Sequence, residues 1–333
     1  MKIIKPKKNV WFALLILLPV LATNLHSIFD DAPAGARNIA MSNASTAIGD
    51  DIYCAFYNPA GFAKIKSHEF GIDYGRPFIG LDDNSVIANS FVGYARKIKN
   101  KTTLSLGWSK FNLSGYFTEN VLAFGCGREL NHIPLSVGTK IKLLNRVYNK
   151  TAYTENAVNL SGDTLGGTDP VFSNGYSRSC FSMDIGLLYD ITEHNSIGLA
   201  VDNLNQPNIG FRSTDAVFRA VKAGYAYKTE SIIIDVDFIF KNGDRLINSG
   251  FEKWVGLNEN SKIAMRCGFG IGSREYENAS LGVGYKYDGL FQIDYSFKYP
   301  LKGVSDFYGS HNVSFTMRYW KGTGKSEKKA RTE

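Results

Sequence analysis

After its first 22 residues the sequence has no continuous apolar run long enough for a membrane-spanning helix. Cysteine is also rare, and the four cysteines lie far apart, with no Cys-x-x-Cys pair and no neighbouring histidine: Cys54, Cys126, Cys180 and Cys267. This spacing disfavours a zinc site and a redox motif, and it leaves one disulfide open without assigning it. We therefore expect neither a metal nor another cofactor.

A basic patch for nucleic acid is missing as well. The formal net charge of +7 comes from four lysines within the first eight residues and from the tail after Trp320, which carries five basic and two acidic residues. The chain between these ends is neutral. Because nucleic-acid binding needs clustered positive charge, we exclude a nucleic-acid partner.

The amino-terminal residues have the pattern of a secretory signal peptide. Lysines precede an apolar core from Val10 to Ala22, which is too short to span a bilayer and is not followed by a stop-transfer pattern. We predict a signal peptide over 1–22, with cleavage after Ser27 as an alternative. A retained anchor helix is the less favoured interpretation. The mature chain is therefore expected to be exported.

The residues that are abundant favour an all-β protein. The sequence contains 33 Gly, 18 Tyr and 22 Phe and no long helical pattern. Alternation of apolar and polar residues repeats from residue 67, as in Ile232, Ile234 and Val236 against Asp235 and Asp237. This alternation predicts fourteen strands: 67–76, 85–97, 101–112, 119–129, 133–149, 179–190, 195–203, 216–228, 230–240, 249–257, 261–271, 278–287, 290–299 and 311–320.

The predicted connections between strands favour a membrane barrel over a soluble sandwich, which periodicity alone does not separate. In this segmentation long and short connections alternate without exception, and short turns at one end with long loops at the other are typical of outer-membrane barrels. We predict a transmembrane antiparallel up-and-down β-barrel of about 14 strands over residues 67–320. An even strand count places both termini in the periplasm, and 321–333 form a basic, disordered tail there.

Between the signal peptide and the first strand lies a stretch of small residues with no strand period. Residues 23–66 are rich in Ala, Ser, Asn and Gly, which pack closely inside another structure. Asp50-Asp51 can cap the turn that follows them. Asn58-Pro59 is a turn dipeptide, and Gly61 adds conformational freedom after it. We predict an amino-terminal plug, or hatch, inside the barrel.

This stretch resembles the amino-terminal signature of the FadL/OmpP1-like outer-membrane barrel superfamily, in its PorV/PorQ-like branch. The matching motifs are Gly35-Ala36-Arg37, Ala40-Met41-Ser42, Asp50-Asp51 and Tyr57-Asn58-Pro59-Ala60-Gly61. The sequence departs from the family at positions 40 and 42, where glycine is usual. The resemblance implies a fourteen-stranded barrel with a luminal hatch, whose plug or gate residues are Gly35, Arg37, Asp50, Asp51, Asn58, Pro59 and Gly61.

Polar residues are predicted to line the lumen. Glu252 and Arg266 fall on neighbouring strands, and a buried charge needs a partner, so we expect an ion pair between them. Asp235, Asp237 and Asp294 are expected to line the lumen too. We favour a structural role for the ion pair over ligand contact. A lumen this polar suits water or a plug better than an apolar tunnel.

An enzyme is not expected. A hydrolase site needs its members within hydrogen-bond reach, whereas the predicted topology places His68, His132 and His194 at one end of the strands and His311 at the other. The first functional hypothesis is therefore passage of small, hydrophobic molecules across the outer membrane, with outer-membrane lipid and such a ligand as partners. The alternative is a PorV-like binding or shuttle role with partners in a protein secretion system.

Overall fold

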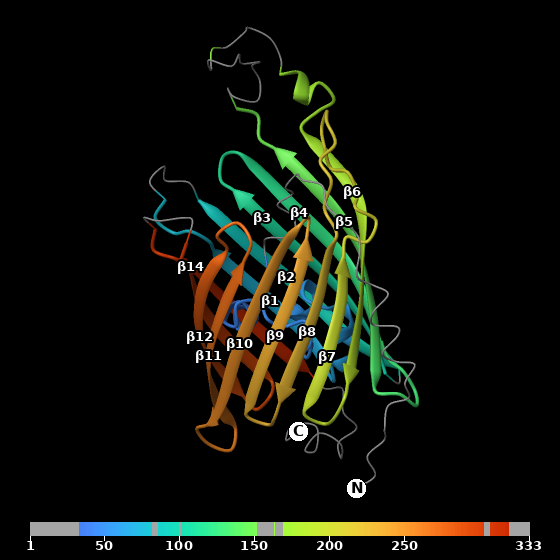
Figure 1. Cartoon of the computed structure of the whole chain (residues 1–333), viewed down its shortest axis with the longest axis vertical. Helices are drawn as coiled ribbons and strands as arrows, with labels where there is room; N and C mark the ends of the chain where they lie inside the picture. Colours follow the sequence, from blue (N-terminus) through green and yellow to red (C-terminus); the bar gives the residue numbers. More distant parts are fainter. Residues whose placement is uncertain are drawn as a thin grey trace.

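The computed structural model describes residues 33–81, 86–99, 101–151, 163, 169–302 and 307–319. These residues form a closed barrel in which every strand pairs antiparallel with its neighbours in the chain, and the last strand pairs with the first (Figure 1). The predicted signal peptide and basic tail lie outside the described residues. The strands are β1 (His68–Arg76), β2 (Ile87–Lys99), β3 (Thr102–Leu113), β4 (Phe117–Glu129), β5 (Leu135–Tyr148), β6 (Ser177–Asp190), β7 (Asn195–Asp202), β8 (Ala220–Lys228), β9 (Ile232–Lys241), β10 (Asp244–Gly256), β11 (Ser261–Gly272), β12 (Glu277–Tyr287), β13 (Phe291–Pro300) and β14 (Ser310–Tyr319).

The strands turn their apolar residues outward and their polar residues inward. In β12, Leu281 and Val283 are 60% and 56% exposed on the outside, whereas Asn278 and Ser280 are each 2% exposed on the inside. A soluble sandwich has the opposite arrangement, because its apolar faces form the core. The outward apolar surface is what lipid requires, and the barrel leaves no unpaired edge. The predicted fold class is thus confirmed.

Two predicted boundaries are wrong. The strand expected over 249–257 begins at Asp244, so the long loop expected before it is a turn at Asn242-Gly243, where φ is 48° and 81°. Asn-Gly favours this left-handed geometry, and the charged residues after it disguised the start of the strand. The strand expected from 216 begins at Ala220, so Arg219 precedes it. Long and short connections therefore do not alternate without exception.

The barrel has two unlike ends. We call the end with the β2–β3, β4–β5 and β6–β7 connections the short-turn end, and the opposite one the long-loop end. Strands β5 and β6 have 14 residues each, but β7 has 8. The β3–β6 side consequently extends beyond the rest at the long-loop end (Figure 1). Among the described residues no helix has the length and apolar character needed to cross a membrane.

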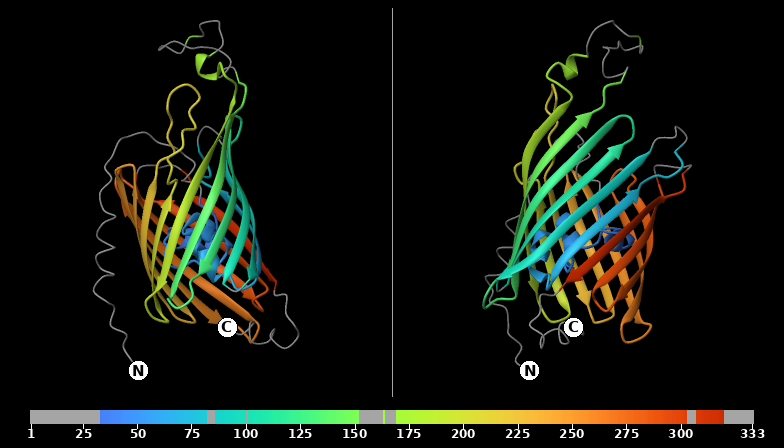
Figure 2. Two further views of the ribbon diagram at one scale, coloured as in Figure 1. Left: turned by 90° about the vertical axis from the view of Figure 1, so that its right-hand side faces the viewer. Right: turned by 180° about the vertical axis from the view of Figure 1, so that it is seen from behind.

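Residues 33–66, which we call the inner segment, lie inside the barrel (Figure 2). The segment contains α2 (Ala36–Ala40) and two 3-10 helices, η2 (Ile52–Phe56) and η3 (Pro59–Lys64). Both 3-10 helices have a polar cap: the Asp51 side chain accepts from Tyr53 N, and the Asn58 side chain accepts from Ala60 N. Such caps satisfy backbone donors that short helices leave free.

We predict that Leu281→Arg destabilises the folded barrel and that Leu257→Arg does not. Both leucines are similarly exposed, at 60% and 58%. Leu281 lies in the middle of β12, whereas Leu257 lies in the turn after β10. A cation facing the lipid midplane costs about 2–4 kcal/mol, and one at the interface costs far less. Urea unfolding in lipid vesicles measures the difference, and equal effects of the two substitutions would contradict a membrane-embedded barrel.

Candidate functional site

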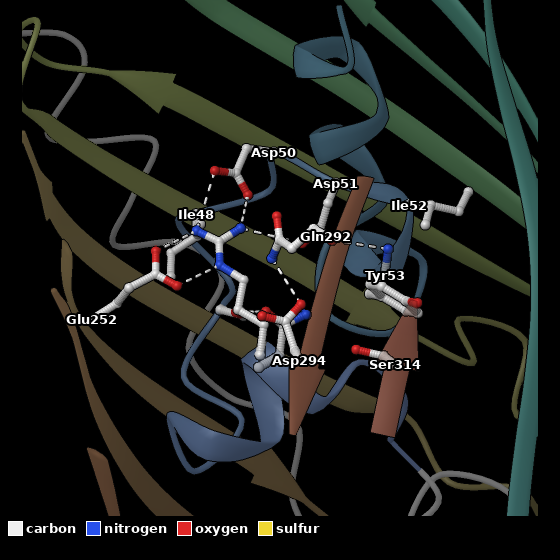
Figure 3. Close-up of polar contacts among 12 residues, drawn as sticks. Ile48, Asp50, Asp51, Ile52, Tyr53, Glu252, Gln292, Asp294 and Ser314 are labelled. Carbon is white, nitrogen blue, oxygen red and sulfur yellow. Dashed lines mark hydrogen bonds and ion pairs between the residues drawn. The ribbon is translucent and has the colours of Figure 1, made fainter. Parts of the chain in front are cut away.

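The guanidinium of Arg37 lies at the centre of a buried ion-pair network, whose acids Asp50, Asp51 and Glu252 are labelled in Figure 3. Its Nε and Nη2 donate to the two carboxylate oxygens of Glu252 in β10, each at 2.8 Å. Its Nη1 donates to Asp50 Oδ1 at 2.6 Å and to Asp51 Oδ2 at 3.2 Å. An unpaired buried guanidinium costs several kcal/mol, so these carboxylates hold α2 in one position against the wall.

The network continues along the inner face of the barrel wall. Glu252 Oε2 also accepts from Arg266 Nε at 2.6 Å, across the β10–β11 pair. Arg266 Nη1 lies 2.8 Å from Asp294 Oδ1 in β13. The ion pair expected between Glu252 and Arg266 is present, and Asp294 extends it to another strand. The inner segment and three strands therefore share one set of charges.

A second ion pair holds η2 near the short-turn end. Arg318 Nε in β14 donates to Glu69 Oε1 in β1 at 2.9 Å. The other Glu69 oxygen accepts from Ile52 N at 3.0 Å. The seam between the first and last strands is thus tied to the inner segment by the same carboxylate.

Asp51 differs from Asp50, the other acid of the inner segment, because it has little access to water. It is 4% exposed, and its Oδ1 accepts from Tyr53 N at 3.0 Å. Burial raises the pKa of Asp51 to about 7, although the guanidinium of Arg37 favours the charged carboxylate. Asp50, by contrast, has a side chain that is 44% exposed. Of the two predicted acids, Asp51 is the structural cap and Asp50 is the one that reaches solvent.

Of the two predicted luminal acids of β9, Asp237 holds the turn of the inner segment at Ser45 and Thr46. Asp237 Oδ2 accepts from Ser45 N at 2.8 Å, from Thr46 N at 2.9 Å and from Thr46 Oγ1 at 2.8 Å. Asp235 shares this face of β9, two residues away, and is fully buried. Asn58, from the Asn-Pro-Ala-Gly motif, donates to Thr46 O at 2.8 Å and to Leu187 O at 3.0 Å. The motif is thereby joined both to the same turn and to the wall.

Lysines on the wall bind backbone carbonyl groups of the inner segment. Lys140 in β5 donates to Ala55 O, and Lys222 in β8 donates to Phe56 O at 2.9 Å. Lys228, also in β8, donates to Ile48 O at 3.0 Å. The carbonyls of Ala55 and Phe56 belong to the last two residues of η2, where helix carbonyls lack internal partners. Sequence reasoning missed these residues, because a lysine on the polar face of a strand looks like one solvated in the lumen.

Glycines on the inner face let the wall come close to the inner segment. At ten positions on nine strands a Cβ would lie less than 3 Å from an atom of the inner segment: Gly71, Gly125, Gly127, Gly138, Gly186, Gly198, Gly224, Gly250, Gly268 and Gly282. We call these the glycine girdle. Because any side chain here would collide, the backbone of the wall packs directly on the inner segment. The sequence did contain a signal for this packing, because these glycines alternate in step with the polar residues of the inward face.

Two cavities beside the inner segment are small. One cavity of about 30 Å³ has mainly apolar walls and lies between Phe56, Phe62 and the β2–β4 wall. A second cavity of about 80 Å³ is lined by charged side chains, including Lys142, Asp184 and Lys222. Lys142 Nζ lies 2.7 Å from Asp184 Oδ1, so these charges already pair with each other.

The structure brings most of the predicted site residues together, although their functional role remains a prediction. Gly35, with φ 92°, donates its N–H to Asp73 Oδ1 at 3.0 Å, Pro59 begins η3, and Gly61 packs on Gly49. Ser42, at a position where glycine was expected, has φ 54°. Within the described part of the chain no cluster of three or more His, Cys, Asp or Glu residues is arranged to hold a metal ion. The arrangement fixes a segment inside a barrel.

Comparisons with known proteins bear on the fold and the family. The model of the family described as type IX secretion system membrane protein PorP/SprF matches residues 54–319. No curated protein sequence matches the chain. Among solved structures, the CymD monoaromatic hydrocarbon channel has 12% identity and a TM-score of 0.61, covering 87% of this chain and 98% of that one.

Two further structures have the same fold. The toluene transporter TbuX of Ralstonia pickettii has 12% identity and a TM-score of 0.61, covering 87% of this chain and 100% of that one. A FadL homologue of Pseudomonas aeruginosa has 11% identity and a TM-score of 0.56, covering 86% of this chain and 98% of that one. The FadL-like fold expected from the sequence is confirmed, whereas none of these matches singles out the PorV/PorQ-like branch.

We predict that Gly198→Ala destabilises the protein and that Gly256→Ala does not. A Cβ at Gly198 would lie 2.0 Å from Thr46 O, whereas one at Gly256 would meet nothing within 4 Å. Overpacking of this kind costs about 1–3 kcal/mol, and an open surface position costs about 0.5 kcal/mol or less. Heat-modifiable gel mobility over a temperature series reads out both variants. Equal melting of the two variants would contradict close packing of the inner segment.

Proposed function

The chain belongs to the PorP/SprF family of type IX secretion system membrane proteins, and from this premise we propose that it is a non-conducting outer-membrane component of that secretion system. In this proposal the inner segment acts as a permanent plug, and the barrel serves as a scaffold that binds other components. The proposal takes up the secretion role that the sequence analysis held as the alternative. Passage of small molecules becomes the second candidate function.

The observation that carries the proposal is the filling of the lumen. The glycine girdle contacts the inner segment from nine strands. A buried ion pair holds the segment at Glu252, and buried hydrogen bonds hold it at Asp237. Opening a path would break several buried charge pairs at once, and each broken pair costs about 3–5 kcal/mol. A gate that opens in normal use needs a gap of only a few kcal/mol between its states. The contacts of the residues predicted as plug or gate therefore favour a fixed plug over a gate that opens.

Passage of small hydrophobic molecules is the second candidate. It is favoured by the fold shared with hydrocarbon channels and by the apolar cavity beside Phe56 and Phe62. That cavity is about 30 Å³, whereas a cavity of about 150 Å³ is of the size that binds benzene. The larger cavity is lined by paired charges, which disfavour an apolar ligand. Space and polarity thus both support the secretion role.

The proposal includes a location and an orientation. The barrel lies in the outer membrane, with lipid around the apolar outer surface of the strands and with partners from the secretion machinery at its ends. The short-turn end faces the periplasm and the long-loop end faces outward, as is usual for outer-membrane barrels. In this orientation β1 begins, and β14 ends, on the periplasmic side.

We predict that deletion of the gene in the native bacterium removes proteins exported by the type IX route from the cell surface and the medium. Uptake of a labelled monoaromatic hydrocarbon should remain unchanged, because the filled lumen gives it no path. Quantitative proteomics of the medium and a radiolabel uptake assay give the two readings, and a strain complemented with the intact gene is the control. Normal export with lost uptake would favour the second candidate and refute the proposal.

The orientation is tested separately by cysteine labelling of intact cells, in a chain whose four native cysteines are replaced by alanine. Tyr308, which is 77% exposed at the long-loop end, should react with an impermeant maleimide after Tyr308→Cys. Gly289, in the short β12–β13 turn, should stay unlabelled after Gly289→Cys until the cells are lysed. The reverse pattern would show that the barrel is inserted the other way round.

A further inference from the structure

The inner face of the barrel is open at one place near the short-turn end. Gly256, the last residue of β10, shares the inner face with Glu252 and Trp254, because strand residues alternate between faces. A Cβ at Gly256 would meet no atom within 4 Å, in contrast to the glycines of the girdle. The described residues therefore leave the inner face around Gly256 uncovered, and we call this recess at the end of the lumen the mouth.

Two lysines face this recess from adjacent strands. Lys262 in β11 is paired with Gly256 on one side and with Lys286 in β12 on the other. Like charges placed directly opposite each other on neighbouring strands are destabilising. Neither lysine has a hydrogen-bond or ion-pair partner anywhere in the part of the chain that the structure describes.

Four acids of the neighbouring ion-pair networks already have partners within the chain. Asp50 and Glu252 bind Arg37, Glu69 binds Arg318, and Asp294 lies 2.8 Å from Arg266. A cross-strand lysine pair without its own counter-charge destabilises the fold by electrostatic repulsion. An anion from outside the chain would offset this repulsion. Such an unneutralised pair in a recess is a recognition feature.

An aromatic side chain completes the recess. Trp254 is half-buried on the inner face of β10, and the guanidinium of Arg266 lies over its ring at 5.3 Å from the centroid. The mouth thus offers an aromatic wall beside two ammonium groups. We propose that the mouth binds an acidic peptide segment of a protein partner, with carboxylates at Lys262 and Lys286 and apolar atoms against Trp254.

A peptide fits this recess better than a lipid headgroup. The two lysines share the inner face with Gly284, whose position is packed against Arg266 and Asp294, so they point away from the surrounding membrane. An extended peptide can enter the mouth from solution, whereas a lipid is held in the bilayer outside the wall. That the partner comes from the periplasm rests on the proposed function and orientation. That the mouth binds an acidic peptide does not depend on either.

The test measures affinity in the purified full-length chain in a non-ionic detergent. The probe is octaglutamate carrying a neutral fluorophore, read by fluorescence anisotropy, and a Gly-Ser peptide of equal length with the same fluorophore is the reference. The Lys262→Gln, Lys286→Gln double variant removes the charge, and Gly256→Leu fills the recess without removing charge. Lys253→Gln is the matched control, because Lys253 lies in the same part of β10 but points outward.

We expect the double variant and Gly256→Leu each to bind octaglutamate roughly tenfold more weakly than the unaltered chain, and Lys253→Gln to bind it equally well. Binding should also weaken in about 0.5 M salt, where charges are screened over a few ångström. Unchanged gel mobility shows that each variant is folded. Equal affinity of the double variant and the unaltered chain, or of octaglutamate and the Gly-Ser peptide, would overturn the proposal.

Three further outcomes separate this inference from others. If the double variant loses affinity for inorganic phosphate but not for octaglutamate, the ligand is a phosphate and the assignment to a peptide is wrong. If octaglutamate binds as expected but the gene deletion leaves export intact, the binding site stands and the secretion role fails. If export is lost but the double variant binds the probe normally, the secretion role stands and the peptide site fails.

Discussion

A positive charge buried inside a membrane barrel has to be neutralised from several directions, and the architecture follows from how this is done for Arg37. Its carboxylate partners come from the inner segment itself, through Asp50 and Asp51, and from the wall, through Glu252. Glu252 in turn neutralises Arg266, which reaches Asp294. Each buried charge is stable only while its partner is present. Loss of one pair therefore destabilises both the inner segment and the wall.

Charge pairs alone do not close a lumen, because the long side chains that make them hold two backbones apart. The glycine girdle solves this by removing wall side chains where the inner segment passes. The contact between the two is therefore backbone against backbone at Gly138 and Gly198, with no room for a ligand. The lysines that bind the carbonyls of η2 and Ile48 complete the contact by satisfying polar groups that would otherwise be buried without partners. Glycines thus close the space between the wall and the inner segment, whereas charged residues on the wall hold the segment in place.

The barrel and its strand count could be predicted from the sequence, because strand alternation is local and repeats many times. The Glu252–Arg266 pair could be expected too, since neighbouring strands and a shared face suffice to bring two such residues together. The lysine–carbonyl bonds and the girdle could not, because they depend on where an aperiodic segment passes inside the barrel. The early start of β10 was missed for a different reason. Asn242-Gly243 is a strong hairpin signal, but the polar residues after it resemble a loop.

The seam between β1 and β14 constrains the order in which the molecule is built. The inner segment precedes β1 in the chain, yet it contacts strands around the barrel from β1 to β14. Because the wall fits it so closely, we expect the segment to be in place while the seam is still open. The segment then serves as a template around which the hairpins wrap, and Glu69 joins it to both seam strands through Ile52 and Arg318. We therefore expect seam closure to be a late step of folding that depends on a correctly placed inner segment.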